Sequence, residues 1–417
     1  MLTSRAQSNK GSGLRDSSRG KTDGVVSLGK TFHRVFGGRA EAAASAPGRI
    51  NFIGEHTDSY GGLCLPAAVD RRLYVVGRAR RDRRVVLRSL TLNATAVLTL
   101  PEPAPRGNFS DYAAALGWEM HRRGLPVRGY EAVVLGNLLP SAGMASSAAL
   151  LTALASLVTR LNEISLKPQE LVDLCHAAEA GFLGVRCGIM DHSAAVHPRR
   201  KQALLLDCRD GTSRDVQVKL KGVKFLLFDS GIRRDLRESA YNDRRSEGDR
   251  ALEQVKRVAR KVSHYRDLTP RKLTALKAKL PAPLFLRALH IVEENERVPL
   301  AAEALRRGQA KRLGQLLYAS HESLSRLYQV SLPEIDALVE ASHKVPGVLG
   351  LRIMGGGFGG LLLGLLESAR ATEAAEALRR IYRRQSRIKG GYFFVGLDGG
   401  LRDETLSSAA PLLEPAD

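Results

Sequence analysis

Several residues that could bind and orient a small molecule lie in one short segment, residues 46–58. Arg49, Glu55, His56 and Asp58 occur there among apolar positions, and two glycines follow at 61 and 62. Short polar side chains on one loop suit a hydroxylated ligand, because each hydroxyl needs its own hydrogen-bond partner. The segment therefore predicts a binding site for such a ligand, although a lone histidine is more often a structural hydrogen-bonding residue than a catalyst.

A single acid, Asp191, follows a glycine-containing apolar turn at residues 187–190. An aspartate in this position can be a buried general base or the cap of a helix. The residues alone leave these two interpretations open.

Of three segments that could bind phosphate, the one at residues 139–150 fits best. A strand-like run ends at Leu135, a turn rich in Pro, Gly and Ser follows, and a long apolar helix begins near Ser146. Free N–H groups and the positive dipole at a helix start bind anions, and a serine hydroxyl there can reach Mg²⁺. Capping of the helix by Ser146 or Ser147 is the alternative interpretation.

The other two segments match the consensus sequences of phosphate-binding loops but lack the flanking features that such loops require. Residues 24–31 satisfy G-x-x-x-x-G-K-[ST], but the polar tail before them cannot supply the buried strand of a P-loop. Residues 355–360 satisfy G-x-G-x-x-G, but a strand follows them, and Arg380 stands where an acid is required. We therefore predict a turn into a helix over 31–36, and a glycine turn between strands at 355–360.

The elements that would position these residues are mixed strands and helices in two lobes, of class α+β or α/β. The composition of residues 1–24, rich in Ser, Gly, Arg and Lys, predicts a disordered tail. A turn-rich segment at 207–211 predicts a boundary between an N-terminal lobe over 25–210 and a C-terminal lobe over 211–417. Strands are expected at 72–79, 84–87, 96–100, 130–135, 223–229, on both sides of the glycine turn within 348–366, and last at 391–397. Helices are expected at 111–123, 146–161, 242–262, 283–307, 310–326, 333–343 and 370–386.

The composition of the chain excludes several classes of protein. The chain has 417 residues, 44% hydrophobic and 26% charged, which excludes overall disorder, collagen and coiled coil. No apolar run approaches the ~20 residues of a membrane span, and four cysteines without CxxC spacing indicate reduced thiols of a cytoplasmic protein. The formal net charge of +21 favours anionic ligands, but the cations lie among acids or on helical faces and no zinc finger or RNP motif accompanies them. We expect no specific nucleic-acid binding.

Taken together, these segments resemble the galactokinase branch of the GHMP small-molecule kinases. Residues 46–58 look like the family's galactose signature, the loop before Ser146 and Ser147 like its phosphate loop, and 355–360 like its third motif. Four more similar segments lie at 188–191, 241–245, 290–297 and 331–336. Seven motifs in the family's order, over about residues 30–400, make the resemblance specific.

The resemblance implies an α+β fold with a ribosomal-S5-domain-2-like N-terminal lobe and a ferredoxin-like C-terminal lobe. It implies phosphorylation of galactose at its anomeric hydroxyl by ATP with Mg²⁺, and we expect a monomer. Phosphoryl transfer asks the protein mainly for positioning and charge stabilisation. Asp191 would orient the O1 hydroxyl and accept its proton, while Arg49 would keep Asp191 ionised and stabilise charge on the transferring phosphoryl group.

The resemblance also implies which residues hold the two substrates. The other sugar hydroxyls would be held by Glu55, His56, Asp58, Gly188 and Tyr241. The nucleotide would be held by Pro140, Ser141, Ala142, Gly143, Met144, Ala145, Ser146, Ser147, Ala148, Gly355, Gly356 and Gly357, with Phe109 and Tyr112 near the base. Ser147 would be the Mg²⁺ ligand.

The chain departs from the family pattern at several positions. Ser59 and Tyr60 stand where Tyr and Asn are usual, His192 replaces Gln, and Met354 replaces Thr. The phosphate loop is one residue shorter than usual and has Ala145 in place of a serine. The changes near the sugar keep open another sugar kinase, for a hexose, an arabinose or an amino sugar. A catalytically weak galactokinase-like regulator is a further alternative, against which the presence of both Arg49 and Asp191 argues.

Overall fold

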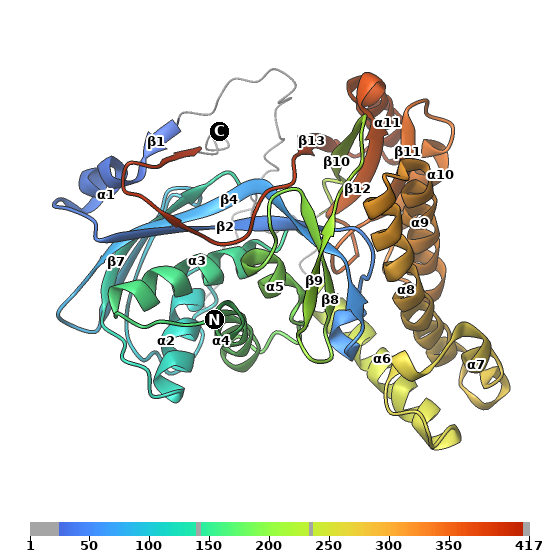
Figure 1. Ribbon diagram of the computed structural model, residues 1–417, viewed down its shortest axis with the longest axis horizontal. Coiled ribbons are helices and arrows are strands. Elements are labelled where there is room, and N and C mark those ends of the chain that lie inside the picture. Colours follow the sequence, from blue (N-terminus) through green and yellow to red (C-terminus); the bar gives the residue numbers. More distant parts are fainter. Residues whose placement is uncertain (1–24, 139–142, 233–236, 412–417) are drawn as a thin grey trace, which may run out of the picture.

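The computed structural model describes residues 25–138, 143–232 and 237–411. These residues form two lobes that lie side by side (Figure 1). The tail predicted over residues 1–24 lies outside the described residues, as do Pro140, Ser141 and Ala142 of the predicted phosphate loop. No helix of the described ranges is long and apolar enough to cross a membrane.

Within the described ranges, the N-terminal lobe is built on a sheet of six strands in the order β14-β2-β4-β7-β5-β6. Neighbouring strands are antiparallel except β5 and β7, which are parallel. The strands are β2 (Ala42–Asn51), β4 (Pro66–Ala79), β5 (Arg84–Ser89), β6 (Ala94–Thr99), β7 (Tyr130–Gly136) and β14 (Arg402–Glu404). The helices beside them are α1 (Leu28–Phe36), α2 (Asp111–Arg122), α3 (Ser146–Leu161), α4 (Pro168–Phe182) and α5 (Met190–Val196).

The two faces of this sheet are covered by different helices. Helices α2 to α5 lie against one face and α1 against the other (Figure 1). Alternate residues of a strand point to opposite faces, so Val75 packs in the main core while its neighbour Val76 packs with Leu28 and Phe32 of α1. Helix α3 is buried over most of its circumference, as expected for a helix that is apolar all round. Its start is therefore held rigidly at the end of the sheet.

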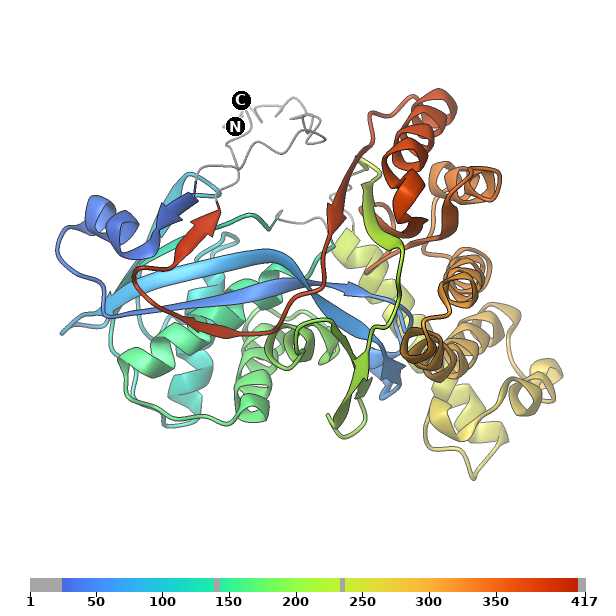
Figure 2. The same cartoon turned by 45° about the horizontal axis from the view of Figure 1, so that its top comes forward.

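The described part of the C-terminal lobe contains a sheet of four antiparallel strands in the order β11-β12-β10-β13, with helices packed outside it (Figure 2). The strands are β10 (Val223–Asp229), β11 (Val348–Ile353), β12 (Leu361–Glu367) and β13 (Gly391–Val395). The helices are α6 (Arg237–Val258), α7 (Pro270–Thr274), α8 (Ala282–Arg307), α9 (Ala310–Glu322), α10 (Pro333–Ser342) and α11 (Ala371–Ser386). Mainly antiparallel sheets with helices beside them confirm the α+β class.

The end of the chain differs from the sequence-based expectation. The strand predicted to be last is followed by β14, which pairs with β2, and by β15 (Ala409–Pro411), which pairs with β1 (Val25–Ser27). This returning segment crosses the N-terminal lobe (Figure 1, red). The buried guanidinium of Arg72 anchors it by donating to the carbonyl oxygens of Gly399 and Gly400, at 2.8 and 2.7 Å.

The predicted division at residues 210 and 211 also falls inside a paired structure. In the described chain, β3 (Leu63–Cys64), β8 (Gln202–Asp207) and β9 (Ser213–Gln217) form a separate sheet, in which β8 pairs with β9 across that division. The turn-rich segment therefore connects two paired strands, and it does not by itself mark a boundary between the two lobes. Helix α9 also ends earlier than expected and continues as a π-helical turn, Ser323–Tyr328.

The P-loop-like segment is a strand and a helical turn. Residues 25–27 form β1, and α1 begins at Leu28, with Lys30 exposed on its first turn. We therefore expect Lys30→Ala to leave the KM for ATP within about twofold of the parent value, since a twofold change is only about 0.4 kcal/mol. Steady-state kinetics on the folded variant test this. A 100-fold rise, about 2.7 kcal/mol, would restore the P-loop interpretation.

Candidate active site

A cavity of about 180 Å³ brings together most of the residues singled out in the sequence. It collects the end of β2 and the loop after it, the starts of α3, α5 and α6, one residue of α4, and the loop between β11 and β12. Its lining residues are Arg49, Glu55, His56, Asp58, Ser147, Glu179, Val185, Cys187, Gly188, Met190, Asp191, Tyr241, Gly355 and Gly356. Both lobes therefore contribute to one site.

Arg49 and Asp191 form a two-point ion pair in this cavity. Arg49 Nε donates to Asp191 Oδ1 at 2.9 Å and Nη2 donates to Oδ2 at 3.1 Å. Asp191 lies in the first turn of α5, whose N-cap is Ile189, so the helix-cap interpretation is wrong. Burial raises the pKa of the Asp191 carboxyl, and the charge of Arg49 opposes that shift. A half-buried carboxylate held by a guanidinium, open to the cavity, is well suited to accept a proton.

His56 presents an unpaired ring nitrogen within the same site. Burial lowers its pKa to about 4, so the ring is neutral near pH 7. Its Nε2 is buried and has no hydrogen-bond partner among the described residues. The ring packs 4.5 Å from that of Tyr328 and 5.6 Å from that of Tyr241. A fixed, neutral imidazole with a free nitrogen can bind a ligand hydroxyl as donor or acceptor.

Asp58 begins a short 3₁₀ turn, Asp58–Tyr60, and packs directly on Gly188. A Cβ on Gly188 would lie 2.3 Å from Asp58 Oδ2, so only glycine leaves room for the carboxylate. Burial, followed by the charges of Asp191 and Glu55, raises the pKa of Asp58 to about 7. This carboxyl can thus accept or donate a hydrogen bond to a hydroxyl near neutral pH.

Glu55 joins the signature loop to the glycine loop of the other lobe. Its Oε1 accepts from the backbone N–H of Gly355 and from Nη2 of the buried Arg352, both at 2.9 Å. The predicted turn between two strands at 355–360 is confirmed, since it joins β11 to β12. Gly355 and Gly356 line the cavity, whereas Gly357 packs against Val330 outside that lining.

The described part of the predicted phosphate loop, Gly143 to Ala148, runs into the start of α3. Ala145 is the N-cap, at φ 57°, and its methyl group offers no capping oxygen. Ser146 and Ser147 therefore lie inside the first turn, and the capping interpretation of these serines is wrong. The N–H groups of that turn are left without a side-chain cap, which is how a helix start binds phosphate. The carbonyl of Gly143 accepts from Arg49, which fixes the loop beside Asp191.

Glu179 is a cavity residue that the sequence analysis missed. It is buried on α4, and its Oε2 lies 3.0 Å from Nε2 of His192. Burial acts to raise the pKa of Glu179, but the contacts with His192 and Ser147 outweigh it and leave the pKa below its ordinary value. The available signal was an acid in an apolar helical face, between Ala178 and Phe182. A carboxylate beside a serine hydroxyl is the kind of oxygen donor set that Mg²⁺ prefers.

Phe109 and Tyr112 are not brought into this cavity. Both lie at the start of α2, where they are half-buried against the core of the N-terminal lobe. Their contact with a nucleotide base stays a prediction. Ser59, one of the positions that depart from the family pattern, lies beside the site, with its Oγ 3.4 Å from the hydroxyl of Tyr241.

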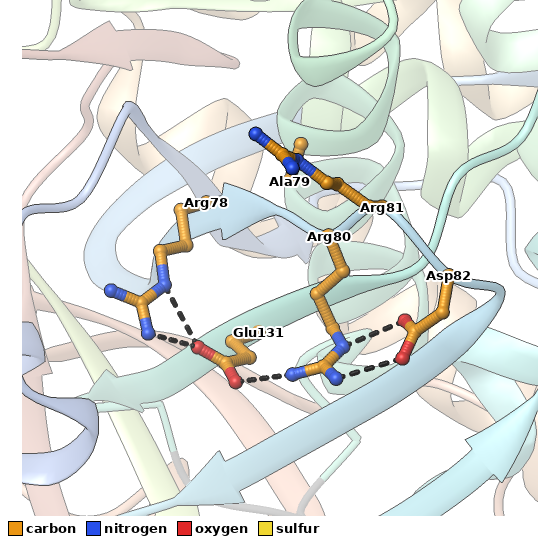
Figure 3. A pocket seen from close by; sticks show the side chains of 6 residues that line it. All are labelled: Arg78, Ala79, Arg80, Arg81, Asp82 and Glu131. Atoms are coloured by element: carbon orange, nitrogen blue, oxygen red, sulfur yellow. Dashed lines mark hydrogen bonds and ion pairs between the residues drawn. The ribbon is translucent and has the colours of Figure 1, made fainter.

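A second, more open hollow lies at the ends of β4 and β7, away from these residues (Figure 3). Arg78 and Arg80 both pair with Glu131, at 2.7 and 2.5 Å, and Arg80 also pairs with Asp82 at 2.8 Å. The carboxylates of Asp82 and Glu131 thus offset two of the three arginines that line the hollow, the third being Arg81. We assign it no ligand.

Comparisons with known proteins agree with this geometry. Residues 30–79 match the galactokinase galactose-binding signature, 111–199 the GHMP kinases N terminal domain, and 301–384 the GHMP kinases C terminal domain. The chain is 37% identical to a galactokinase of Chloroflexus aggregans over 83% of this chain and 89% of that protein. It is 36% identical to the human galactokinase over 85% and 91%. A crystal structure of Lactococcus lactis galactokinase complexed with galactose is similar with a TM-score of 0.86 and 29% identity, over 90% of this chain and 99% of that one.

Proposed function

The chain belongs to the galactokinases, a branch of the GHMP kinase superfamily, and we propose how its cavity carries out their reaction. The protein phosphorylates galactose, with ATP as the phosphoryl donor. We propose that the acceptor is the anomeric hydroxyl and the product galactose 1-phosphate. The observation that carries this mechanism is the two-point Arg49–Asp191 pair beside the start of α3.

Asp191 acts as the general base in this proposal. It takes the proton of the sugar O1 hydroxyl as O1 bonds to the γ-phosphorus and the bond from that phosphorus to the β-phosphate oxygen breaks, releasing ADP. Arg49 orients the carboxylate and stabilises the negative charge on the phosphoryl group in flight. The uncapped N–H groups at the start of α3 hold the phosphates.

His56, Asp58 and Tyr241 hold the other sugar hydroxyls. The unpaired, buried Nε2 of His56 and the half-buried, protonatable carboxyl of Asp58 support this role, since both line the cavity and can each take a hydroxyl partner. Glu55 uses one oxygen to fix the glycine loop, which leaves its other oxygen for the sugar.

We expect Asp58→Ala to raise the KM for galactose by about 10–100-fold, the cost of losing a hydrogen bond to a charged group. The KM for ATP should change by no more than about twofold, because Asp58 lies on the side of Gly188 rather than of α3. Steady-state kinetics with each substrate varied in turn measure both values. The opposite pattern would place Asp58 in the nucleotide site.

Ser147 and Glu179 are the residues that fit a magnesium ion. Both line the cavity and contact one another, and both present oxygen atoms. When bound, Mg²⁺ would neutralise charge on the transferring phosphates. The protein's share is to hold the hydroxyl and the carboxylate in place beside the start of α3.

Ser147→Ala is expected to lower Mg²⁺-dependent activity by at least about 10-fold, since even partners of metal ligands are worth 10–100-fold. Its free energy of unfolding should fall by less than about 1 kcal/mol, because Ala145 rather than Ser147 caps the helix. Ser146→Ala is the matched control, because Ser146 does not line the cavity and should lose far less activity. Metal-independent turnover, or a Ser147→Ala variant as active as the parent, would contradict this assignment.

A panel of sugars tests the substrate. Coupled-enzyme measurement of ADP release should give the highest kcat/KM with galactose among galactose, glucose, arabinose and galactosamine. A higher value with another sugar would favour a different sugar kinase of the superfamily. Sugar and ATP binding without ADP release would favour a regulatory protein.

We further propose that the protein is a cytoplasmic monomer. All four cysteines lie in the described ranges and are free thiols, which suits a reducing compartment. Light scattering coupled to size-exclusion chromatography measures the mass in solution, and a mass of two chains would contradict the monomer.

A further inference from the structure

His192 is fully buried directly behind the cavity, at 0% exposure, although it does not line the cavity itself. It follows the proposed base in sequence and stands where the family usually has Gln. Its Nε2 lies 3.0 Å from Oε2 of Glu179, which brings α5 and α4 into close contact at the proposed metal-binding residue, although neither ring nitrogen meets hydrogen-bond geometry with a described residue. A buried polar ring in this position needs a reason, because burial of an unsatisfied polar group is costly.

The surroundings of Glu179 show what His192 contributes. Among the described residues, the carboxylate also lies beside the hydroxyl of Ser147 and the thiol of Cys187, whose Sγ is 3.8 Å from Oε2. A thiol is a weak donor, and Ser147 would itself be occupied by the metal ion. His192 is therefore the one neighbour named here that can hold the carboxylate while metal and nucleotide are bound.

The ring of His192 is itself held in place. The ring of His176, one turn before Glu179 on α4, packs edge-on to it with centroids 5.9 Å apart. His176 Nε2 lies 3.2 Å from the carbonyl oxygen of Cys187, which fixes that second ring. The ring of His192 on α5 therefore packs against a second ring on α4, a packing contact that a phenylalanine at position 176 can also make.

We propose that His192 is a positioning residue for divalent-metal binding, which holds the Glu179 carboxylate in the orientation that meets the metal ion beside Ser147. The inference rests on the proposed function, because it requires Glu179 to be a metal ligand. Gln at the same position would present a side-chain N–H at similar reach, so His192 takes over a role that an amide can also perform. Partners of this kind are typically worth 10–100-fold in metal affinity.

The test measures binding of Mn²⁺, as a spectroscopic probe for Mg²⁺, to the full chain with a non-hydrolysable ATP analogue. Free Mn²⁺ is followed by electron paramagnetic resonance, and galactose affinity is measured separately by calorimetry. The variants are His192→Phe, which keeps a ring without nitrogen, His192→Gln, and Glu179→Gln. His176→Phe is the matched control, because it alters the same histidine pair without removing the contact with Glu179.

His192→Phe should weaken Mn²⁺ binding by about 10–100-fold, while His192→Gln and His176→Phe stay within about threefold of the parent. Galactose affinity should be unchanged in these three variants. If His192→Phe fails to fold, His192→Asn replaces it. The asparagine side chain is one methylene shorter than that of glutamine, so we expect a similar loss of Mn²⁺ affinity.

Two results would contradict the proposed role of His192, and only the second would also contradict the proposed metal site. If Glu179→Gln loses Mn²⁺ affinity but His192→Phe keeps it, the metal site stands and His192 has only a packing role. If Glu179→Gln itself keeps parental affinity, the proposed metal site is wrong, and the role of His192 falls with it.

Discussion

Asp191→Asn is expected to lower kcat by about 10²–10⁴-fold, the usual contribution of general acid–base catalysis, while galactose affinity changes little. Asparagine keeps the size and the hydrogen-bonding reach of the side chain but cannot accept the proton of the sugar hydroxyl. Steady-state kinetics give kcat, and calorimetry with galactose gives the affinity. The variant also loses the charge that pairs with Arg49, so its thermal stability should be measured alongside.

His192→Gln is the control for this result, because it changes the neighbouring residue without removing the carboxylate. Because His192 does not line the cavity, kcat and galactose affinity should both stay close to their parental values. If Asp191→Asn kept near-parental kcat while His192→Gln abolished turnover, the catalytic assignment would be wrong, and His192 would become the candidate base.

Arg49→Ala should be comparably inactive to Asp191→Asn. The substitution removes the charge that stabilises the phosphoryl group, frees the Asp191 carboxylate, and leaves the carbonyl of Gly143 without its donor. Because residues that act as one unit are strongly non-additive, the double variant should be barely slower than either single variant.

A cycle of the parent, the two single variants and the double variant tests this coupling. Thermal melts of all four proteins separate catalysis from stability, since removing one partner of a partly buried ion pair also destabilises the fold. Losses in kcat that multiplied in the double variant would show that Arg49 and Asp191 act independently.

The residues at the centre of this account could be found from the sequence because each lies in a compact motif. Arg49, His56 and Asp58 lie in one short segment, residues 46–58, and Asp191 follows a recognisable turn. Whether Asp191 is a base or a helix cap could not be decided there, because both uses need an acid at the same place. The deciding fact is its contact with Arg49, which lies 142 positions away in the chain.

Glu179 and its contact with His192 could not be predicted in the same way. Glu179 belongs to no local pattern of polar residues, and only the packing of α4 against α5 brings the two side chains together. The role of Ala145 was also hidden, since a residue with φ of 57° at a helix start is a consequence of the loop around it.

The order of strands and helices was predicted well where hydrophobic patterns are long, as in β10 and α3, whose bounds match those expected. The returning strands β14 and β15 were missed because each has three residues, too few for any periodic pattern. Their position depends on tertiary contacts, among them those of Arg72 with the backbone of residues 399 and 400.

The central claim is that the Arg49–Asp191 pair directs ATP to the anomeric hydroxyl of galactose. The most direct test is to incubate the protein with galactose, ATP and Mg²⁺ and to identify the sugar phosphate by ³¹P and ¹H nuclear magnetic resonance. We expect a single product in which the phosphorus couples to the anomeric proton, and no such product with Asp191→Asn over the same time. Phosphate on another carbon, or the same product formed equally fast by the variant, would contradict it.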